Sequence, residues 1–263
     1  MSICIIVGHG KSKTGGYDSG ALSKDKKYHE FRIAKEIARY AADYYNETYG
    51  EQCDLMNYNG NLYLSERIKQ ANLKRYNFVA EIHLNAGGGT GTEVFYSIGS
   101  AKGKKIAAAI SSNISKAFGI TNRGAKTKKG ANGDYFGIIR QTTMEAVLVE
   151  TVFIDTNDLR CVATAEGQRV CGIAIAQAIA AARGVKKKAP APAPAPVKKV
   201  YYFGKCNAKY TSLVDALRDQ GYNSSYAYRK KVAAVNGIKV YAGTAKQNIA
   251  LLTLMKQGKL IKP

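Results

Sequence analysis

The chain has 263 residues, enough for one sizeable core and a further small module, since single domains most often span about 100 to 150 residues. Forty Lys and Arg face nineteen Asp and Glu, and the resulting charge of +21 favours a polyanionic partner such as nucleic acid, an anionic membrane face or a teichoic-acid-bearing wall. Five cysteines without a C-x-x-C pair or regular spacing argue against a disulfide framework and a cysteine zinc site.

The first residues favour a strand over a signal peptide. Residues 1–7 have no basic segment, no long apolar core and no small-residue cleavage site. The longest apolar stretches, near residues 173–182, are rich in Ala and far shorter than a membrane span. We therefore expect synthesis in a cytoplasm, without membrane insertion.

Up to residue 184, strand-like and helix-like patterns alternate. Short, mostly β-branched runs predict strands at 2–7, 52–56, 78–82, 92–96, 137–139 and 146–149. Amphipathic or Ala-rich segments predict helices at about 30–46, from a Ser65 cap to 76, at about 106–118 and at 165–183. This alternation predicts an α/β fold, a mostly parallel twisted sheet flanked by helices, with function at the carboxyl ends of the strands.

The composition changes abruptly at residues 185–199, where three lysines precede alternating Ala and Pro. Such a run favours a semi-rigid polyproline II spacer, so we expect a catalytic domain at 1–184, a linker at 185–199 and a second domain at 200–263. Helix caps at Ser212, Ser225 and Thr244 predict a small, mainly helical second domain. Its expected core is Leu213, Leu217, Ile249, Leu252 and Met255.

Four polar side chains follow predicted strands or open a helix: His9, Glu30, His83 and Glu150. Any one of them alone is more often a hydrogen-bonded core residue. Carboxyl ends of parallel strands share one edge, so the two histidines and Glu150 should emerge together, where the helix headed by Glu30 returns. His9, Glu30 and His83 would hold one Zn²⁺, and Glu150, its pKa raised by burial, would be the base for a zinc-activated water.

The same residues carry a family resemblance. The motifs stand in order as Val7-Gly8-His9-Gly10, Glu30, Glu81-Ile82-His83-Leu84-Asn85-Ala86, Asn122-Arg123-Gly124 and Val149-Glu150-Thr151-Val152-Phe153-Ile154. Over about residues 2–183 the chain resembles the zinc-dependent N-acetylmuramoyl-L-alanine amidases of the amidase-3 family. The resemblance implies zinc ligands at His9, Glu30 and His83 and a catalytic carboxylate at Glu150.

The chain departs from this pattern around the first histidine. The usual D-x-G-H-G opening reads Ile6-Val7-Gly8-His9-Gly10, without the acidic residue, so the orientation of His9 must come from elsewhere. His29 is a rival ligand, and neighbours on a helix project about 100° apart, so His29 and Glu30 do not both face one metal. The family pattern favours Glu30, with His29 as a solvated or capping residue.

Other residues near the motifs leave alternatives open. Asn85 is a candidate to hold either substrate or a neighbouring loop, and Arg123, expected in a loop, is a candidate for peptide carboxylates or glycan. The glycine-rich run at 87–91 lacks a following Lys-Ser/Thr, so it is expected to be a turn and not a phosphate cradle. Glu93 and Asp134 have no partner that the sequence identifies.

The resemblance implies hydrolysis of the amide bond between N-acetylmuramic acid and L-alanine in peptidoglycan. The second domain is similar to cell-wall-binding modules, which bind peptidoglycan or anionic wall polymers and raise the effective concentration of the catalyst; a stabilising appendage with a solvated basic surface is the alternative. Without a signal peptide, we expect action at the wall after release from a host or mother cell. This suggests a phage endolysin, with a sporulation autolysin as the rival.

Two other classes fit less well. A zinc peptidase acting on stem peptides is disfavoured because H-x-x-E and H-E-x-x-H are both absent. A non-catalytic wall- or nucleic-acid-binding protein has no need for Glu150 beside two histidines, and no recognised nucleic-acid motif occurs. Nucleic acid is therefore not an expected partner.

Overall fold

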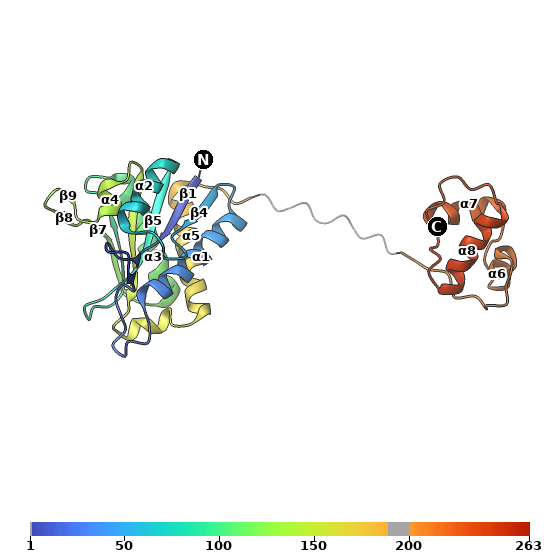
Figure 1. The fold of residues 1–263 in the computed structure, drawn as a ribbon, viewed down its shortest axis with the longest axis horizontal. Coiled ribbons are helices and arrows are strands. Elements are labelled where there is room, and N and C mark those ends of the chain that lie inside the picture. The colour runs from blue at the N-terminus through green and yellow to red at the C-terminus, as the bar shows by residue number, and fades with distance from the viewer. Residues whose placement is uncertain (1, 189–199) are drawn as a thin grey trace. The chain divides into compact units, whose positions relative to one another are not determined.

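The computed structural model describes residues 2–188 and 200–263 (Figure 1). The chain divides into two compact units, Met1–Ala189 and Pro190–Pro263. Most of the predicted spacer, residues 189–199, lies outside the described residues. Among the described residues, no helix is long and apolar enough to cross a membrane.

The first unit is built on a six-stranded sheet with the order β4-β1-β5-β10-β6-β7. The strands are β1 Ser2–Val7, β4 Gln52–Met56, β5 Phe78–Asn85, β6 Thr92–Tyr96, β7 Asn122–Lys126 and β10 Glu145–Phe153. Neighbours from β4 to β10 are parallel, β6 is antiparallel to β10, and β7 is parallel to β6. Two small hairpins add β2 Gly10–Lys11 with β3 Tyr17–Asp18, and β8 Lys129–Gly130 with β9 Gly133–Asp134. The predicted fold class is confirmed.

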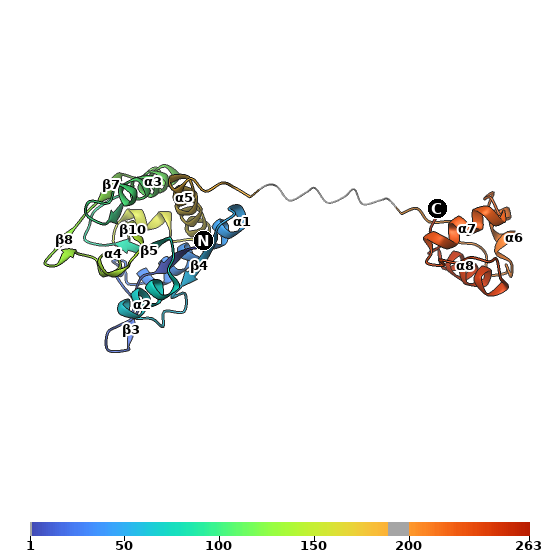
Figure 2. The same ribbon diagram turned by 90° about the horizontal axis from the view of Figure 1, so that it is seen from above.

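Helices cover both faces of this sheet (Figure 2). One face carries α1 Glu30–Thr48, α3 Ala101–Phe118 and α5 Ala165–Arg183, and the other carries α2 Leu64–Lys74 and α4 Gly137–Gln141. A short 3₁₀ helix, Asn157–Cys161, follows β10. The side chains of β1 alternate between the two cores, Ile3, Ile5 and Val7 on the α1 side and Cys4 and Ile6 on the α2 side. All five cysteines are free and buried, as expected for core residues.

Three predicted elements of the first unit were wrong. Residues 137–139, predicted as a strand, begin α4, because a buried pair such as Ile138 and Ile139 suits a helix as well as a strand. Arg123 lies in the edge strand β7 and not in a loop. The sequence did not predict this strand because its residues are polar and lack the β-branched pattern. The second helix begins at Leu64 rather than after a Ser65 cap, and the Glu66 carboxylate accepts from the N–H of Tyr63 at 2.7 Å.

The second unit contains α6 Leu213–Asp219, α7 Tyr226–Val235 and α8 Ala245–Gln257. The predicted caps Ser212, Ser225 and Thr244 each accept a backbone N–H from the third residue of the helix. The predicted core is correct except for Ile249, which is 56% exposed, because the buried stripe of α8 runs through Leu251, Leu252 and Met255.

Close packing of α5 on α1 depends on Gly172. A Cβ at this position would lie 2.7 Å from Ile37 O and 2.8 Å from Ala41 N, both backbone atoms of α1. We expect Gly172→Ala to lower the free energy of unfolding of the first unit by about 1–3 kcal/mol through overpacking. Urea unfolding measures this change. Gly50→Ala is the control, since no heavy atom lies within 4 Å of its Cβ, and a Gly172 variant as stable as this control would contradict the close packing.

Candidate functional site

A cavity of about 370 Å³ opens where β1 and β5 end, and it brings the predicted residues together. Its lining includes His9, Glu30, His83, Glu150 and Asn85. Glu150 is the register partner of His83 across the parallel pair β10 and β5, so the two side chains leave the same face of the sheet. The predicted convergence at one sheet edge is therefore present in the fold.

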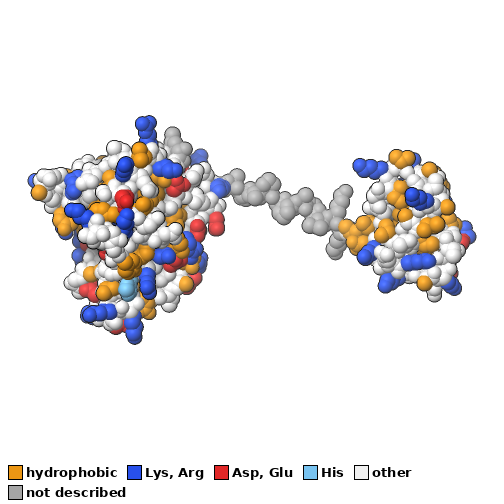
Figure 3. Space-filling model, viewed as in Figure 1, with side chains coloured by type: hydrophobic (Ala, Val, Ile, Leu, Met, Phe, Trp, Pro, Cys, Tyr) orange, Lys and Arg blue, Asp and Glu red, His pale blue; other side chains and the backbone are white. Residues whose placement is uncertain are grey.

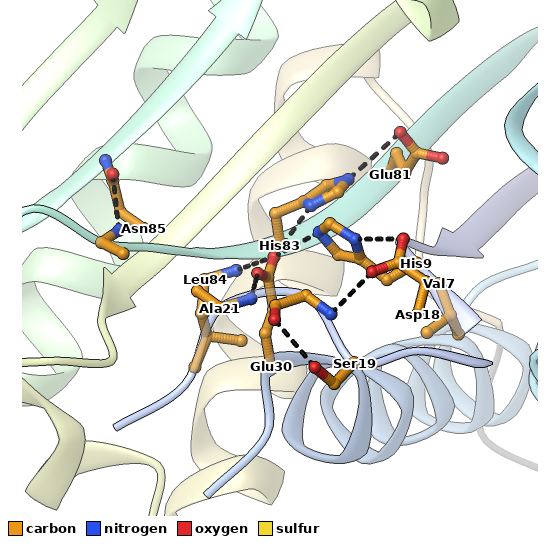
Figure 4. Close-up of polar contacts among 12 residues, drawn as sticks. Val7, His9, Asp18, Ser19, Ala21, Glu30, Glu81, His83, Leu84 and Asn85 are labelled. Carbon is orange, nitrogen blue, oxygen red and sulfur yellow. Dashed lines mark hydrogen bonds and ion pairs between the residues drawn. The ribbon is translucent and has the colours of Figure 1, made fainter. Parts of the chain in front are cut away.

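The centre of this cluster is the carboxylate of Glu30, at the first residue of α1 (Figure 4). Its Oε1 lies 3.1 Å from His9 Nε2 and 2.9 Å from His83 Nδ1. It also accepts the N–H of Leu84 at Oε1 and that of Ala21 at Oε2. Burial raises the pKa of Glu30, but the bonds to the two histidines outweigh burial and hold the pKa far below its usual value.

Each imidazole is held on its other side by a second carboxylate. Asp18 Oδ2 lies 2.9 Å from His9 Nδ1, and Glu81 Oε2 lies 3.2 Å from His83 Nε2. Burial lowers the pKa of His83, but the hydrogen bonds to Glu30 and Glu81 raise it well above its usual value. Asp18, at the end of the β2–β3 hairpin, supplies the orientation of His9 that the missing acidic residue left unexplained.

Two glycines leave room for the side chains of His83 and Glu30 to lie against the backbone. A Cβ at Gly8 would lie 2.3 Å from the ring of His83, and a Cβ at Gly20 would lie 2.6 Å from Glu30 Oε2. Any side chain at Gly8 would displace the second histidine. The motif glycine before His9 therefore has a steric reason.

His9 itself has φ = 60°, a left-handed conformation that is uncommon for a residue with a side chain. Asn57 Nδ2 donates to Val7 O and to His9 O, both at 2.8 Å, and Arg67 donates to His9 O at 3.0 Å. These bonds fix the turn after β1 and so direct the imidazole toward Glu30.

A buried ion pair adjoins His83 through Glu81. Arg67 Nε donates to Glu81 Oε1 at 2.9 Å, and the two side chains are only 5% and 2% exposed. Arg67 also donates a hydrogen bond to the carbonyl oxygen of Leu62. The buried guanidinium therefore has both a counter-charge and hydrogen-bond acceptors. The pair neutralises the carboxylate that positions His83.

The cluster has the donor set and spacing of a metal site. One ligand atom from each of His9, Glu30 and His83 lies within 4.8 Å of the others. Ligands of a tetrahedral zinc lie about 3.4 Å apart, close to the separations from Glu30 to the two rings. His29, the rival ligand, is the N-cap residue of α1 and is not part of this cluster, although its side chain makes no cap hydrogen bond.

Glu150 has a different environment from Glu30. Its Oε2 is buried and has no hydrogen-bond partner among the described residues. Burial raises the pKa of Glu150 to about 7, with Glu30 and Glu93 adding to this rise and His83 opposing it. A carboxylate with such a pKa can accept and return a proton near neutral pH.

The residues beside Glu150 form a charged network. Glu93 of β6 is the register partner of Glu150. Its carboxylate accepts hydrogen bonds from Arg123 Nε and Lys126 Nζ, each at 2.6 Å, and from Asn85 Nδ2 at 2.9 Å. Asn85 thus lines the cavity while Glu93 holds its amide, whereas Arg123 is not among the lining residues. The sequence did not identify Arg123 and Lys126 as partners of Glu93, because both lie in β7, which is remote from Glu93 in sequence and has no strand-like pattern. Nor did it identify the partner of Asp134, which accepts from Ser97 Oγ at 2.7 Å.

A family model and two curated relatives match parts of the chain. A family model described as N-acetylmuramoyl-L-alanine amidase matches residues 3–181. A sporulation-specific N-acetylmuramoyl-L-alanine amidase of Bacillus subtilis is 31% identical over 159 residues, 59% of this chain and 57% of that protein. An L-alanyl-D-glutamate peptidase of Listeria phage A118 is 47% identical over 53 residues, 20% of this chain and 19% of that protein. The chain thus spans little more than half of the first relative and about a fifth of the second.

Solved structures share the fold of the first unit. Cwp6 from Clostridium difficile matches with a TM-score of 0.62 and 29% identity, over 69% of this chain and 29% of that one. The catalytic domain of CD27L, an endolysin targeting Clostridia difficile, matches with a TM-score of 0.56 and 29% identity, over 68% of this chain and 96% of that one.

The Arg67–Glu81 pair leads to a test of stability. Arg67→Met leaves the buried Glu81 carboxylate without its guanidinium partner and with only the imidazole of His83 beside it, and we expect a loss of about 3–5 kcal/mol in the free energy of unfolding. Adding Glu81→Gln should restore part of it, because the uncompensated charge is removed. Urea unfolding of the single and double variants measures both effects. Arg39→Met, which breaks a more exposed pair with Glu36, should cost less than about 1 kcal/mol, and an equal loss in both single variants would contradict the role of burial.

Proposed function

The chain belongs to the amidase-3 family of N-acetylmuramoyl-L-alanine amidases, and we propose that it hydrolyses the amide bond between N-acetylmuramic acid and L-alanine in peptidoglycan with the help of one zinc ion. One observation supports this above all others. His9, Glu30 and His83 converge in a cavity that also contains the buried, unpartnered carboxylate oxygen of Glu150.

His9, Glu30 and His83 would hold the zinc ion. Two imidazole nitrogens and a carboxylate oxygen are typical zinc donors, and three protein ligands leave a position open. When bound, zinc acts as a Lewis acid on a carbonyl oxygen and lowers the pKa of water. Asp18 and Glu81 would keep both rings oriented through their second nitrogens.

Glu150 would serve as the general base and then the general acid. It takes a proton from the attacking water and returns it to the leaving nitrogen of L-alanine, so the carboxylate is regenerated in each turnover. Burial raises the pKa of Glu150 in the metal-free cavity, which favours proton acceptance by this carboxylate. The apolar wall of the cavity, which includes Leu64, Phe136 and Ile138, would limit the access of bulk water to this exchange.

We further propose that the protein acts at the bacterial wall as a phage endolysin, after release from the cell that makes it. The structural match to the catalytic domain of an endolysin and the short match to a phage peptidase favour this role. The longer match to a sporulation-specific amidase favours the rival role of an autolysin released from a mother cell. The chemistry is the same in both.

The second unit would hold the enzyme on its polymeric substrate. Residues 197–263 carry thirteen Lys and Arg against two Asp, a charge that complements anionic wall polymers. A bound tether raises the local concentration of the first unit at the wall without altering its chemistry.

Glu150→Gln tests the proposed chemistry. Loss of the general base should lower the turnover of purified peptidoglycan by about 10²–10⁴-fold, while the fold and zinc content stay unchanged. The wild type should expose new N-terminal L-alanine without new reducing ends, as measured by amino-terminal labelling and reducing-sugar assays.

Three results would contradict this mechanism. Cleavage within the stem peptide would show a peptidase, and new reducing ends would show a glycosidase. Undiminished turnover by Glu150→Gln, or by protein from which zinc has been removed with a chelator, would remove the proposed base or the proposed metal.

Asp18→Asn tests the positioning of His9. A neutral amide orients the ring less strongly, and we expect the zinc affinity to fall by about 10- to 100-fold, as is typical for partners of metal-bound histidines. Competition with a chromophoric chelator measures the affinity directly. Asp25→Asn, a change in the same segment outside the cavity, should leave it unchanged. Equal affinities in the two variants would show that Asp18 does not position His9.

A further inference from the structure

The second unit carries a surface patch that the amidase chemistry does not use. Its members are Tyr226 and Arg229 of α7 and Asn248 of α8, which lie around the buried ring of Tyr241. The geometry points to a binding site in which this aromatic–arginine patch takes a phosphodiester group, together with the adjoining sugar or polyol, of an anionic wall polymer. The inference rests on the wall-binding role proposed above and names its site and ligand class.

The half-buried guanidinium of Arg229 lies at the centre of the patch. It donates through Nε to Ser224 O at 3.0 Å, and through Nη1 to Tyr241 Oη at 2.7 Å and Asn248 Oδ1 at 2.9 Å. All three acceptors are neutral, and no carboxylate pairs with Arg229 among the described residues. A partly desolvated cation without a counter-charge is costly, and a phosphate oxygen would supply both the charge and an acceptor for Nη2.

An exposed aromatic side chain, Tyr226, lies three residues before Arg229 on α7, and this spacing places both on one face of the helix. Tyr226 is 50% exposed, and its hydroxyl donates to Tyr241 O at 3.0 Å, which fixes the ring against the segment before α8. The centroids of the two tyrosine rings are 5.6 Å apart, so the buried ring of Tyr241 supports the exposed ring of Tyr226. A fixed, exposed ring next to a cation provides an apolar surface for the carbons of a sugar or polyol whose phosphate reaches Arg229.

The charge of the unit is unevenly distributed. Its two acidic residues both lie in α6, where Asp215 pairs with Arg218 at 3.7 Å and Asp219 accepts from the hydroxyl of Tyr210. After Asp219 the sequence has eight Lys and Arg and no acidic residue. On the face seen in Figure 3, basic side chains are spread among hydrophobic ones. Several uncompensated cations complement a polymer that carries a charge in every repeat better than a single peptide carboxylate.

Wall sedimentation tests the patch in the full chain, with Glu150→Gln present so that the wall is not digested. The probes are purified walls that retain their phosphodiester-linked polymers and the same walls after hydrofluoric acid has removed them. We expect stripped walls to bind at least about tenfold more weakly, and Tyr226→Ala and Arg229→Gln each to lose about tenfold on intact walls, or about 1.4 kcal/mol.

Matched controls separate the patch from general charge and general exposure. Arg218→Gln removes the same charge from α6, and Tyr201→Ala removes another exposed tyrosine; both should bind within about twofold of the parent protein. Tyr226→Phe loses the hydroxyl bond to Tyr241 O but keeps the ring, so it should retain most of the binding that Tyr226→Ala loses. If Arg229→Gln fails to fold, as circular dichroism would reveal, Tyr226→Ala against Tyr226→Phe still decides.

Three outcomes would overturn the patch: equal binding to stripped walls, equal losses in the controls, or displacement from intact walls by duplex DNA at equal phosphate concentration. Release of L-alanine from soluble muramoyl-peptide fragments, measured with Glu150 present, keeps the two proposals distinguishable. Selective wall binding without this release defeats the proposed amidase activity alone, and release without selective binding defeats the patch alone.

Discussion

The first unit depends on one carboxylate that is almost completely buried. Glu30 lies between His9 and His83 at the edge of the sheet, and an ionised carboxylate in such a place is stable only if it is paired and hydrogen-bonded. Both rings and two backbone N–H groups meet this need. Much of the local structure serves the same arrangement, from the absence of a side chain at Gly8 to the left-handed backbone of His9.

Neighbouring carboxylates of this cavity have opposite properties because their surroundings differ. Glu30, between two imidazoles, has a pKa far below its usual value, whereas Glu150, buried without a partner for one oxygen, has a pKa raised to about 7. Glu93, in register with Glu150, is neutralised by Arg123 and Lys126. A pair of acids whose pKa values are pushed apart can divide the work of binding a cation and transferring a proton. The difference follows from the surroundings of each carboxylate rather than from residue type, since Glu30 begins helix α1 and Glu150 lies in strand β10.

The sequence predicted the features that follow from periodicity and strand direction. Parallel strands end at one edge, so the convergence of His9, His83 and Glu150 could be derived before any coordinates, and the caps of the second unit were readable from Ser and Thr. The role of Asp18 and the network around Glu93 could not be predicted, because each depends on a strand pairing that only the tertiary structure creates. Asp18 lies in a two-residue strand of a hairpin, and the partners of Glu93 lie in the polar edge strand β7. Residues 137–139 and Ile249 were misassigned for another reason. A short apolar run does not specify whether it forms a helix or a strand, or which of its faces is buried.

Under the proposed function, the first unit would select the bond and the second unit would attach the enzyme to the polymer. The groups proposed to act on the amide lie in the cavity of the first unit, where Glu30 and the two imidazoles are about 3 Å apart, and chemistry at such distances depends on their exact positions. Attraction by the cations after Asp219 acts over longer distances and weakens with salt. Under the proposed function, these cations would therefore affect how often the enzyme meets the wall rather than how fast it cleaves a bound amide. Because the chain itself connects them, neither unit needs an interface with the other for attachment to raise the local concentration of the cavity. Hydrogen bonds to Tyr241 and Asn248 fix the guanidinium of the half-buried Arg229, so its geometry as well as its charge could distinguish one polyanion from another.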